Sequence, residues 1–305
     1  MNREGRAQGK ALVGRDLSRR ASLLWIAVGY LLACGLGVVV LGWLEGPIWN
    51  RLLWADVAAT GLVFAFSMAM DNSSVYDPYW SVAPPLFALA FCLDVGGWSA
   101  RQVVLLTLLT LWGVRLTWNW ASAWRGMRHE DWRYVAFRQR FPRSYWLVSA
   151  LGIHLFPTLM VALASSSMIP ALTVLERDWS MLDLLATLVL AGALVLEATA
   201  DLQMRAGLRQ SKPGEVCRKG LWSYSRHPNY VGEMGIWWGL WLFAVSADPS
   251  WWWTLFGPMA MTAMFLFISI PMLEKRQLQR RPEYARYQRE VGMLFGRRSL
   301  APSSH

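Results

Sequence analysis

Cysteine, histidine and charge are all scarce in this chain of 305 residues. It holds three cysteines and four histidines, and Cys34, Cys92 and Cys217 lie far apart, without a CxxC pair or a matching histidine cluster. The sequence therefore predicts neither a disulfide framework nor a metal site, and the cysteines are expected to fill small apolar spaces. Charged residues make up only 16% of the chain, too few for an ordinary soluble surface.

A glycine-rich dinucleotide-binding motif is also missing. The nearest match, "GLG" at residues 35–37, lies in an apolar run and lacks the third glycine in register, so a Rossmann domain is not expected. The chain shows no internal repeat, low-complexity tract or separate soluble domain. The lack of an inverted repeat weighs against a transporter or lipid-binding scaffold, the non-enzyme alternative for a membrane protein.

Apolar residues dominate what is present. Hydrophobic residues make up 55% of the chain, which includes 20 tryptophans. Several apolar runs are long enough to cross about 30 Å of hydrocarbon. We therefore expect an all-α, polytopic transmembrane helical bundle whose first span is an uncleaved anchor. The eight candidate spans are approximately residues 21–44, 52–70, 82–99, 103–123, 145–168, 182–201, 230–247 and 252–273.

The distribution of basic residues tests this topology, because cytoplasmic loops hold most of the lysine and arginine of a membrane protein. Of the 30 basic residues, 26 fall in residues 1–20, 124–144, 202–229 and the stretch after Glu274. The spans place these four segments on one side. Both termini are therefore expected to be cytoplasmic, and the positive charge needs no nucleic-acid partner to explain it. No obligate protein partner is indicated.

One helix face combines acids and arginines. In "LEATADLQMRAGLR", Glu197, Asp201, Arg205 and Arg209 follow one another at steps of four, so a helix carries all four on one face, from the membrane into a basic loop. They could form a ladder of ion pairs that only stabilises the helix end. The alternative is a polar wall for a cofactor, in which the acids accept hydrogen bonds from ribose hydroxyls and the arginines neutralise phosphates.

A second polar stretch, "GLWSYSRHPNYVGE" from Gly220 to Glu233, directly precedes an apolar run. Pro228 is suited to the first turn of a helix, so we expect a helix to begin here. A helix N-terminus beside Arg226 and His227 is a candidate anion site. The same residues could instead cap the helix and reach toward lipid headgroups.

"SYSRHPNYVGE" followed by "WWG" resembles the signature of the steroid 5α-reductase family, especially its bacterial branch. Three further segments agree with that branch: "NSSVYDPYW" (residues 72–80), "EDWRY" (130–134) and "PMLEKRQLQRRPEYARY" (271–287). The chain departs from the family in ending this last region with "REVGMLFG" and in its N-terminal span, which is expected to be an addition to a seven-helix core.

The resemblance implies a membrane oxidoreductase that binds NADPH from the cytoplasmic side and reduces a carbon-carbon double bond conjugated to a carbonyl in a lipid-like substrate. Cofactor positions of the family carry over to Asp201, Arg205 and Asn229, with Glu197 where the steroid enzymes tend to have an amide. Arg226, His227 and Tyr230 belong to the signature. Lys275 and Arg276 align with a basic pair near the cofactor of related sterol reductases, and Glu233 is expected to help orient the cofactor.

The steroid enzymes orient the substrate ketone with a Glu and a Tyr from early helices, and Tyr76 and Asp77 are the nearest candidates here. The expected organisation is a basic tail (1–20), N-terminal transmembrane helices (21–70), a catalytic membrane domain (71–290) and a C-terminal tail (291–305). The expected location is a bacterial inner membrane, with membrane lipids around the bundle.

A related superfamily, the isoprenylcysteine carboxyl methyltransferases, also carries an Arg-His-Pro-x-Tyr element and binds S-adenosylmethionine. That activity is the alternative enzymatic function. NADPH carries a pyrophosphate and a 2′-phosphate, which call for several arginines, whereas S-adenosylmethionine has no phosphate and carries a sulfonium. The basic cytoplasmic segments and Asn229 therefore favour NADPH.

Overall fold

A computed structural model describes residues 17–210 and 214–296. In this part of the chain every regular element is a helix and there is no β-strand, which confirms the predicted all-α class. Most of the predicted basic tail, residues 1–16, and the predicted C-terminal tail from residue 297 lie outside the described residues.

Seven helical stretches in the described residues are long and apolar enough to cross a membrane, and the protein is an integral, multi-pass membrane protein. They are α1 (Arg19–Trp43), α2 (Ile48–Ala69), η1 with α3 (Ser73–Val95), α4 (Ala100–Ala123), α6 to α7 (Tyr145–Ser165), α9 (Met181–Gln210) and η4 to α12 (Pro249–Arg280). The expected seventh span corresponds to α10 (Pro228–Ala247), a helix of 20 residues that is not among these seven.

The chain divides into two compact units. Unit 1 comprises the described residues up to Ala90 together with Thr110–Ala162. Unit 2 comprises Phe91–Leu109 together with the described residues from Leu163 onward. Each unit is assembled from two separate stretches of chain. The boundaries expected at residues 20, 70 and 290 stay a prediction.

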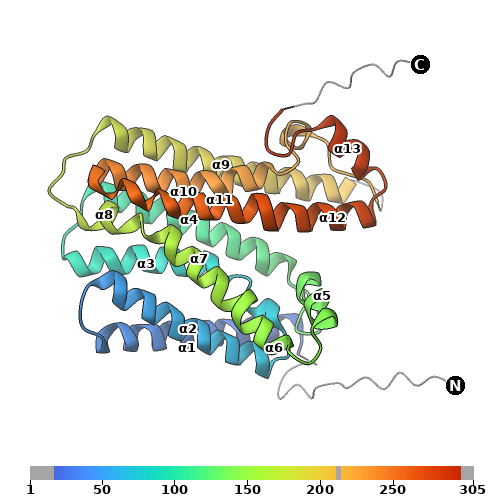
Figure 1. Cartoon of the computed structure of the whole chain (residues 1–305), viewed down its shortest axis with the longest axis horizontal. Coiled ribbons are helices and arrows are strands. Elements are labelled where there is room, and N and C mark those ends of the chain that lie inside the picture. The colour runs from blue at the N-terminus through green and yellow to red at the C-terminus, as the bar shows by residue number, and fades with distance from the viewer. Residues whose placement is uncertain (1–16, 211–213, 297–305) are drawn as a thin grey trace. The chain divides into compact units, whose positions relative to one another are not determined.

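In unit 1, α1 and α2 lie side by side (Figure 1). The hydroxyl of Ser18 caps α1 by accepting a hydrogen bond from the Ala21 amide at 3.2 Å. Gly29 permits the close approach of the two helices, since a Cβ at this position would lie only 3.1 Å from the Phe66 ring. The shorter helices of this unit are η1 (Ser73–Tyr76), α3 (Tyr79–Val95, which continues into unit 2), α5 (Trp132–Arg140), α6 (Tyr145–Val148), the π-helix η2 (Ser149–Leu155) and α7 (Phe156–Ser165, which also continues into unit 2).

In unit 2, α9 and α10 lie side by side (Figure 1). Glycines on α10 make this possible, because a Cβ at Gly239 would lie 3.1 Å from the Leu190 Cα and backbone nitrogen. The other helices of this unit are α8 (Met168–Thr173), η3 (Gly220–Ser223), η4 (Pro249–Leu255), α11 (Phe256–Met264), the π-helix η5 (Phe265–Ser269), α12 (Ile270–Arg280) and α13 (Tyr284–Glu290).

The α9–α10 contact gives a test by substitution. Gly239→Ala should lower the unfolding temperature of the purified protein in detergent, because the new methyl group meets backbone atoms of Leu190 and overpacking typically costs about 1–3 kcal/mol. Gly192→Ala on α9 is the matched control, since nothing lies within 4 Å of a Cβ there. Equal unfolding temperatures for the two variants would contradict the close contact.

Candidate functional site

The predicted cofactor helix α9 meets the turn that precedes α10. Trp222 Nε1 donates to the carbonyl oxygen of Ala200 at 3.0 Å, and the Leu221 amide donates to Gln203 Oε1 at 2.8 Å. Glu197 is buried, and a Cβ at Gly232 would lie 2.6 Å from its Cγ. The two polar stretches singled out from the sequence therefore do lie against each other, inside unit 2.

The helix predicted from Pro228 is confirmed, since α10 begins there with proline in its first turn. His227 is the residue before the helix, and its amide donates to Ser225 Oγ at 3.1 Å. Its ring stacks on Tyr230, with ring centroids 5.6 Å apart and an angle of 10° between the planes. Tyr230 also packs on Phe265 at 5.1 Å.

Glu274 is the hub of this region, and the sequence interpretation missed it. Its Oε1 accepts hydrogen bonds from Arg226 Nε at 2.7 Å and His227 Nε2 at 3.0 Å, and its Oε2 accepts from Gln288 Nε2 at 2.7 Å. The hydroxyl of Tyr284 adds a longer contact at 3.4 Å. One carboxylate thus joins α12, the start of α10 and α13. The sequence feature that could have revealed Glu274 is "PMLEKR", in which an acidic residue directly follows an apolar run.

Arg226 also binds the segment after α13. Its Nη1 donates to the carbonyl oxygens of Gln288 at 3.1 Å and Val291 at 2.5 Å, and its amide donates to Gly292 at 3.1 Å. Arg226 and His227 are only 5% and 2% exposed. These contacts give Arg226 a structural role within the protein, and its expected contact with a phosphate stays a prediction.

The remaining predicted cofactor residues all belong to unit 2. Glu233 is buried, and its Oε1 accepts from Trp237 Nε1 at 3.3 Å. Lys275 and Arg276 directly follow Glu274 on α12. Asp201 and Arg205 are half-buried on α9, while Asn229 lies in the first turn of α10. Their contact with a cofactor stays a prediction.

In unit 1, the predicted catalytic residue Tyr76 forms part of a buried hydroxyl cluster. Its hydroxyl lies 2.7 Å from Thr158 Oγ1, which also lies 2.8 Å from Thr60 Oγ1. Thr158 Oγ1 donates its own proton to the carbonyl oxygen of His154 at 2.9 Å. Because that proton is already used, the hydroxyls of Tyr76 and Thr60 are the donors to Thr158.

Asp77, the other predicted catalytic residue, faces the loop helix α5. Its carboxylate accepts a hydrogen bond from the Tyr134 hydroxyl and lies 3.6 Å from Arg133 Nη2. Burial, and next the negative charge of Asp77, raise the pKa of the Tyr134 hydroxyl well above its usual value, while Arg133 opposes the rise. Asp77, which directly follows η1, therefore connects the turn between η1 and α3 to α5.

A second acid and tyrosine lie deeper in unit 1. Asp56 on α2 is 3% exposed, and its Oδ1 accepts a hydrogen bond from the Tyr79 hydroxyl at 2.7 Å. Its other oxygen, Oδ2, is buried and has no hydrogen-bond partner in the described part of the chain. The span expected from residue 52 would leave Asp56 near its edge, but α2 begins one turn earlier, at Ile48, which places the acid inside the helix.

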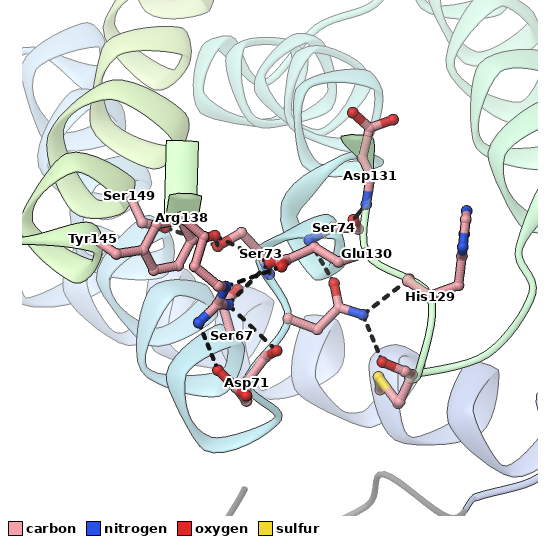
Figure 2. A network of polar contacts seen from close by, with 12 residues as sticks. Ser67, Asp71, Ser73, Ser74, His129, Glu130, Asp131, Arg138, Tyr145 and Ser149 are labelled. Atoms are coloured by element: carbon pink, nitrogen blue, oxygen red, sulfur yellow. Dashed lines mark hydrogen bonds and ion pairs between the residues drawn. The ribbon is translucent and has the colours of Figure 1, made fainter. Parts of the chain in front are cut away.

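A network at the loop end of unit 1 joins two of the motifs that carried the resemblance (Figure 2). Arg138 Nη1 donates to Asp71 Oδ1 at 2.8 Å, and its Nη2 donates to Glu130 Oε1 at 3.1 Å. Asn72 Nδ2 donates to the carbonyl oxygens of Met127 at 2.9 Å and His129 at 3.1 Å. The Ser73 amide donates to Glu130 Oε1 at 2.9 Å, so "NSSVYDPYW" and "EDWRY" contact each other directly.

The Glu274 hub gives a stability test. Glu274→Ala leaves the buried Arg226 without its carboxylate, and removing one partner of a buried ion pair costs about 3–5 kcal/mol. The control, Glu290→Ala, removes ion pairs to the more exposed Arg218 and Arg286, which contribute little to stability because solvent screens them. We expect a much lower unfolding temperature in detergent for Glu274→Ala only. Similar small shifts for both variants would contradict the hub.

Comparison with known proteins places these residues in a family. A family model described as "Protein of unknown function (DUF1295)" matches residues 63–291, a range that includes both the Glu274 hub and the network around Glu130. An uncharacterised protein of Schizosaccharomyces pombe is 30% identical over 284 residues, which cover 85% of this chain and 79% of that protein. No solved structure matches. The chain belongs to the DUF1295 family.

Proposed function

We propose that this protein is a membrane oxidoreductase that uses NADPH to reduce a carbon-carbon double bond conjugated to a carbonyl in a lipid-like substrate. The observation that carries the proposal is the Asp56–Tyr79 pair, a carboxyl group in a membrane-spanning helix with one buried oxygen that lacks a partner. A buried polar atom without a hydrogen bond is costly, so a ligand group that bonds to Asp56 Oδ2 stabilises this arrangement.

The Asp56–Tyr79 pair is suited to binding the carbonyl group of a substrate. Hydride addition to the β-carbon of an enone builds negative charge on the carbonyl oxygen, and a fixed donor in a water-poor site stabilises that charge. A carboxyl group in apolar surroundings favours its neutral, protonated form. Because Tyr79 donates to Oδ1, the proton of a neutral Asp56 resides on Oδ2, where it serves as the donor. This assigns to Asp56 and Tyr79 the role expected for Asp77 and Tyr76.

The chemistry of the residues in unit 2 fits NADPH, which supplies the hydride when bound. Acids accept hydrogen bonds from ribose hydroxyls, and Asp201 and Glu197 supply carboxylates on one face of α9. Arginine and lysine hold phosphates, and Arg205, Lys275 and Arg276 are the candidates, since the bonds of Arg226 go to Glu274 and the backbone. The first turn of α10 adds backbone amides that favour an anion.

The orientation and compartment are part of the proposal. Basic loops favour the cytoplasmic side, and the cofactor residues adjoin such loops, so we place the cofactor opening toward the cytoplasm. A bacterial inner membrane follows from the resemblance to the bacterial branch of the reductase family. The substrate is expected to enter from the lipid.

Ligand-induced stabilisation tests the cofactor. NADPH should raise the unfolding temperature of the purified protein in detergent, because a ligand that binds only the folded state stabilises it, and NADH should raise it less. Asn229→Ala should remove the NADPH effect without unfolding the helices, whereas Asn50→Ala in unit 1 should keep it. Stabilisation by S-adenosylmethionine alone would instead establish the methyltransferase activity.

Replacement of the carboxyl group tests the catalytic role. With a 3-keto-4-ene steroid and a long-chain 2-enal as probes, Asp56→Asn and Tyr79→Phe should lower the rate of NADPH oxidation about 100-fold or more, a typical effect of removing an oxyanion donor. Both variants should retain stabilisation by NADPH. Tyr30→Phe is the matched control, since Tyr30 donates only to backbone carbonyls. Equal rates for Asp56→Asn and the unmodified protein would rule out the assigned role.

A further inference from the structure

A continuous chain of hydrogen bonds runs from the loop end of unit 1 to a buried histidine. Tyr145 Oη donates to Glu130 Oε1 at 3.0 Å and lies 2.7 Å from Ser73 Oγ, which in turn lies 2.9 Å from Ser149 Oγ (Figure 2). His154 Nδ1 lies 3.4 Å from Ser149 Oγ and 2.9 Å from the Ser149 carbonyl oxygen. Hydroxyl groups both donate and accept, so each link through a hydroxyl group can pass a proton, whereas the Ser149 carbonyl only accepts.

The two ends of this chain differ in their access to water. The side chain of Glu130 is 12% exposed, whereas Ser73 and Ser149 are fully buried and His154 is 1% exposed. Arg138 fixes the outer end, because it donates to both carboxylate oxygens of Glu130 at 3.1 and 3.2 Å. Its guanidinium also lies 3.9 Å from the centroid of the Tyr145 ring.

A local change of helix type positions the inner end. Residues Ser149–Leu155 form a π-helix, and such turns bring together residues five apart, as they do for His154 Nδ1 and the Ser149 carbonyl. In a regular α-helix Ser149 and His154 would not face each other. The π-helix therefore completes the connection between the hydroxyl chain and the imidazole.

The surroundings of His154 can bond either protonation state. Nδ1 either donates to the Ser149 carbonyl, which cannot donate back, or accepts a proton from Ser149 Oγ. Ser67 Oγ lies 3.1 Å from Nε2 and 2.9 Å from the carbonyl oxygen of Val63. With a neutral ring Ser67 donates to Nε2; with a protonated ring Nε2 donates to Ser67, whose own proton goes to Val63. Rotation of one hydroxyl thus accommodates the gain or loss of a proton.

His154 borders the hydroxyl cluster that leads to the Asp56–Tyr79 pair. Its ring lies 4.6 Å from the Tyr76 ring, centroid to centroid, and Tyr76 stacks on Tyr79 at 5.1 Å. Thr60, which contacts Thr158, lies one turn after Asp56 on α2. The inner end of the chain is therefore next to the polar groups of the proposed substrate carbonyl site.

We propose that Glu130, Tyr145, Ser73, Ser149 and His154 form a proton path that connects this buried cluster to water on the loop side. The inference rests on the proposed function for its purpose. Hydride addition to an enone moves the π electrons onto the carbonyl oxygen, Asp56 gives that oxygen a proton, and the enol then shifts the proton to the α-carbon. Each saturated double bond consumes one hydride and one proton, and the path supplies that proton to the buried cluster beside Asp56.

Solvent exchange of the His154 ring proton tests the path without a substrate. Protein labelled with ¹⁵N in its four histidine rings is studied by nuclear magnetic resonance in detergent, and His154→Gln identifies the signal by its loss. Tyr145→Phe and Ser149→Ala each remove one link, and we expect either to slow exchange of the His154 ring proton with water at least tenfold. Tyr30→Phe, also in unit 1 but outside the path, should leave the rate unchanged.

Two controls distinguish loss of the proton path from misfolding of a variant and from failure of the proposed function. Far-ultraviolet circular dichroism and elution as a single species show whether a variant is folded, and if Tyr145→Phe fails this check, Ser149→Ala decides. Unchanged exchange in a folded Ser149→Ala variant would overturn the path. Failure of NADPH to stabilise the unmodified protein would remove the proposed function, while the exchange rates would still decide whether the path exists.

Discussion

The constraint on which this structure depends is that polar groups inside a membrane protein must find their partners within the protein, because hydrocarbon offers none. The Glu274 hub meets it with one carboxylate that accepts hydrogen bonds from an arginine, a histidine and an amide. In the Glu130 network, the carboxylate of Glu130 bonds to Arg138 and to the hydroxyl of Tyr145, which in turn bonds to the hydroxyl of Ser73. Asp56 Oδ2 is one of the buried side-chain atoms in the described residues that do not meet it.

Much of the fold could be predicted from the sequence, because it depends on the length and composition of apolar runs. The helical class and the start of α10 at Pro228 both follow from local chemistry. The expected count of eight spans stays a prediction: α10 carries Glu233 in its apolar run and is not among the seven candidate spans of the described residues. Glycines on α10 allow it to fit against α9. Such packing depends on two segments that are far apart in the chain.

The candidate site, like the fold, could be predicted from the sequence only where it depends on local patterns. The steps of four from Glu197 to Arg205 correctly placed these residues on α9, beside the turn that leads into α10. The sequence did not reveal that Arg226 is held by Glu274 and by backbone carbonyls near Val291, since these contacts join residues about fifty or more positions apart. Asp56 was missed for a local reason, a one-turn error in the start of its helix.

The attachment of Arg226 to the carbonyl oxygens of Val291 and Gly292 has a consequence for biosynthesis. The turn before α10 cannot acquire its final set of bonds until residue 292 has left the ribosome, although α9 and α10 can pair much earlier. In the interval, the cationic side chain of Arg226 remains near the membrane surface without these acceptors. Completion of this region therefore follows the synthesis of residue 292 and is a separate step from the pairing of α9 with α10.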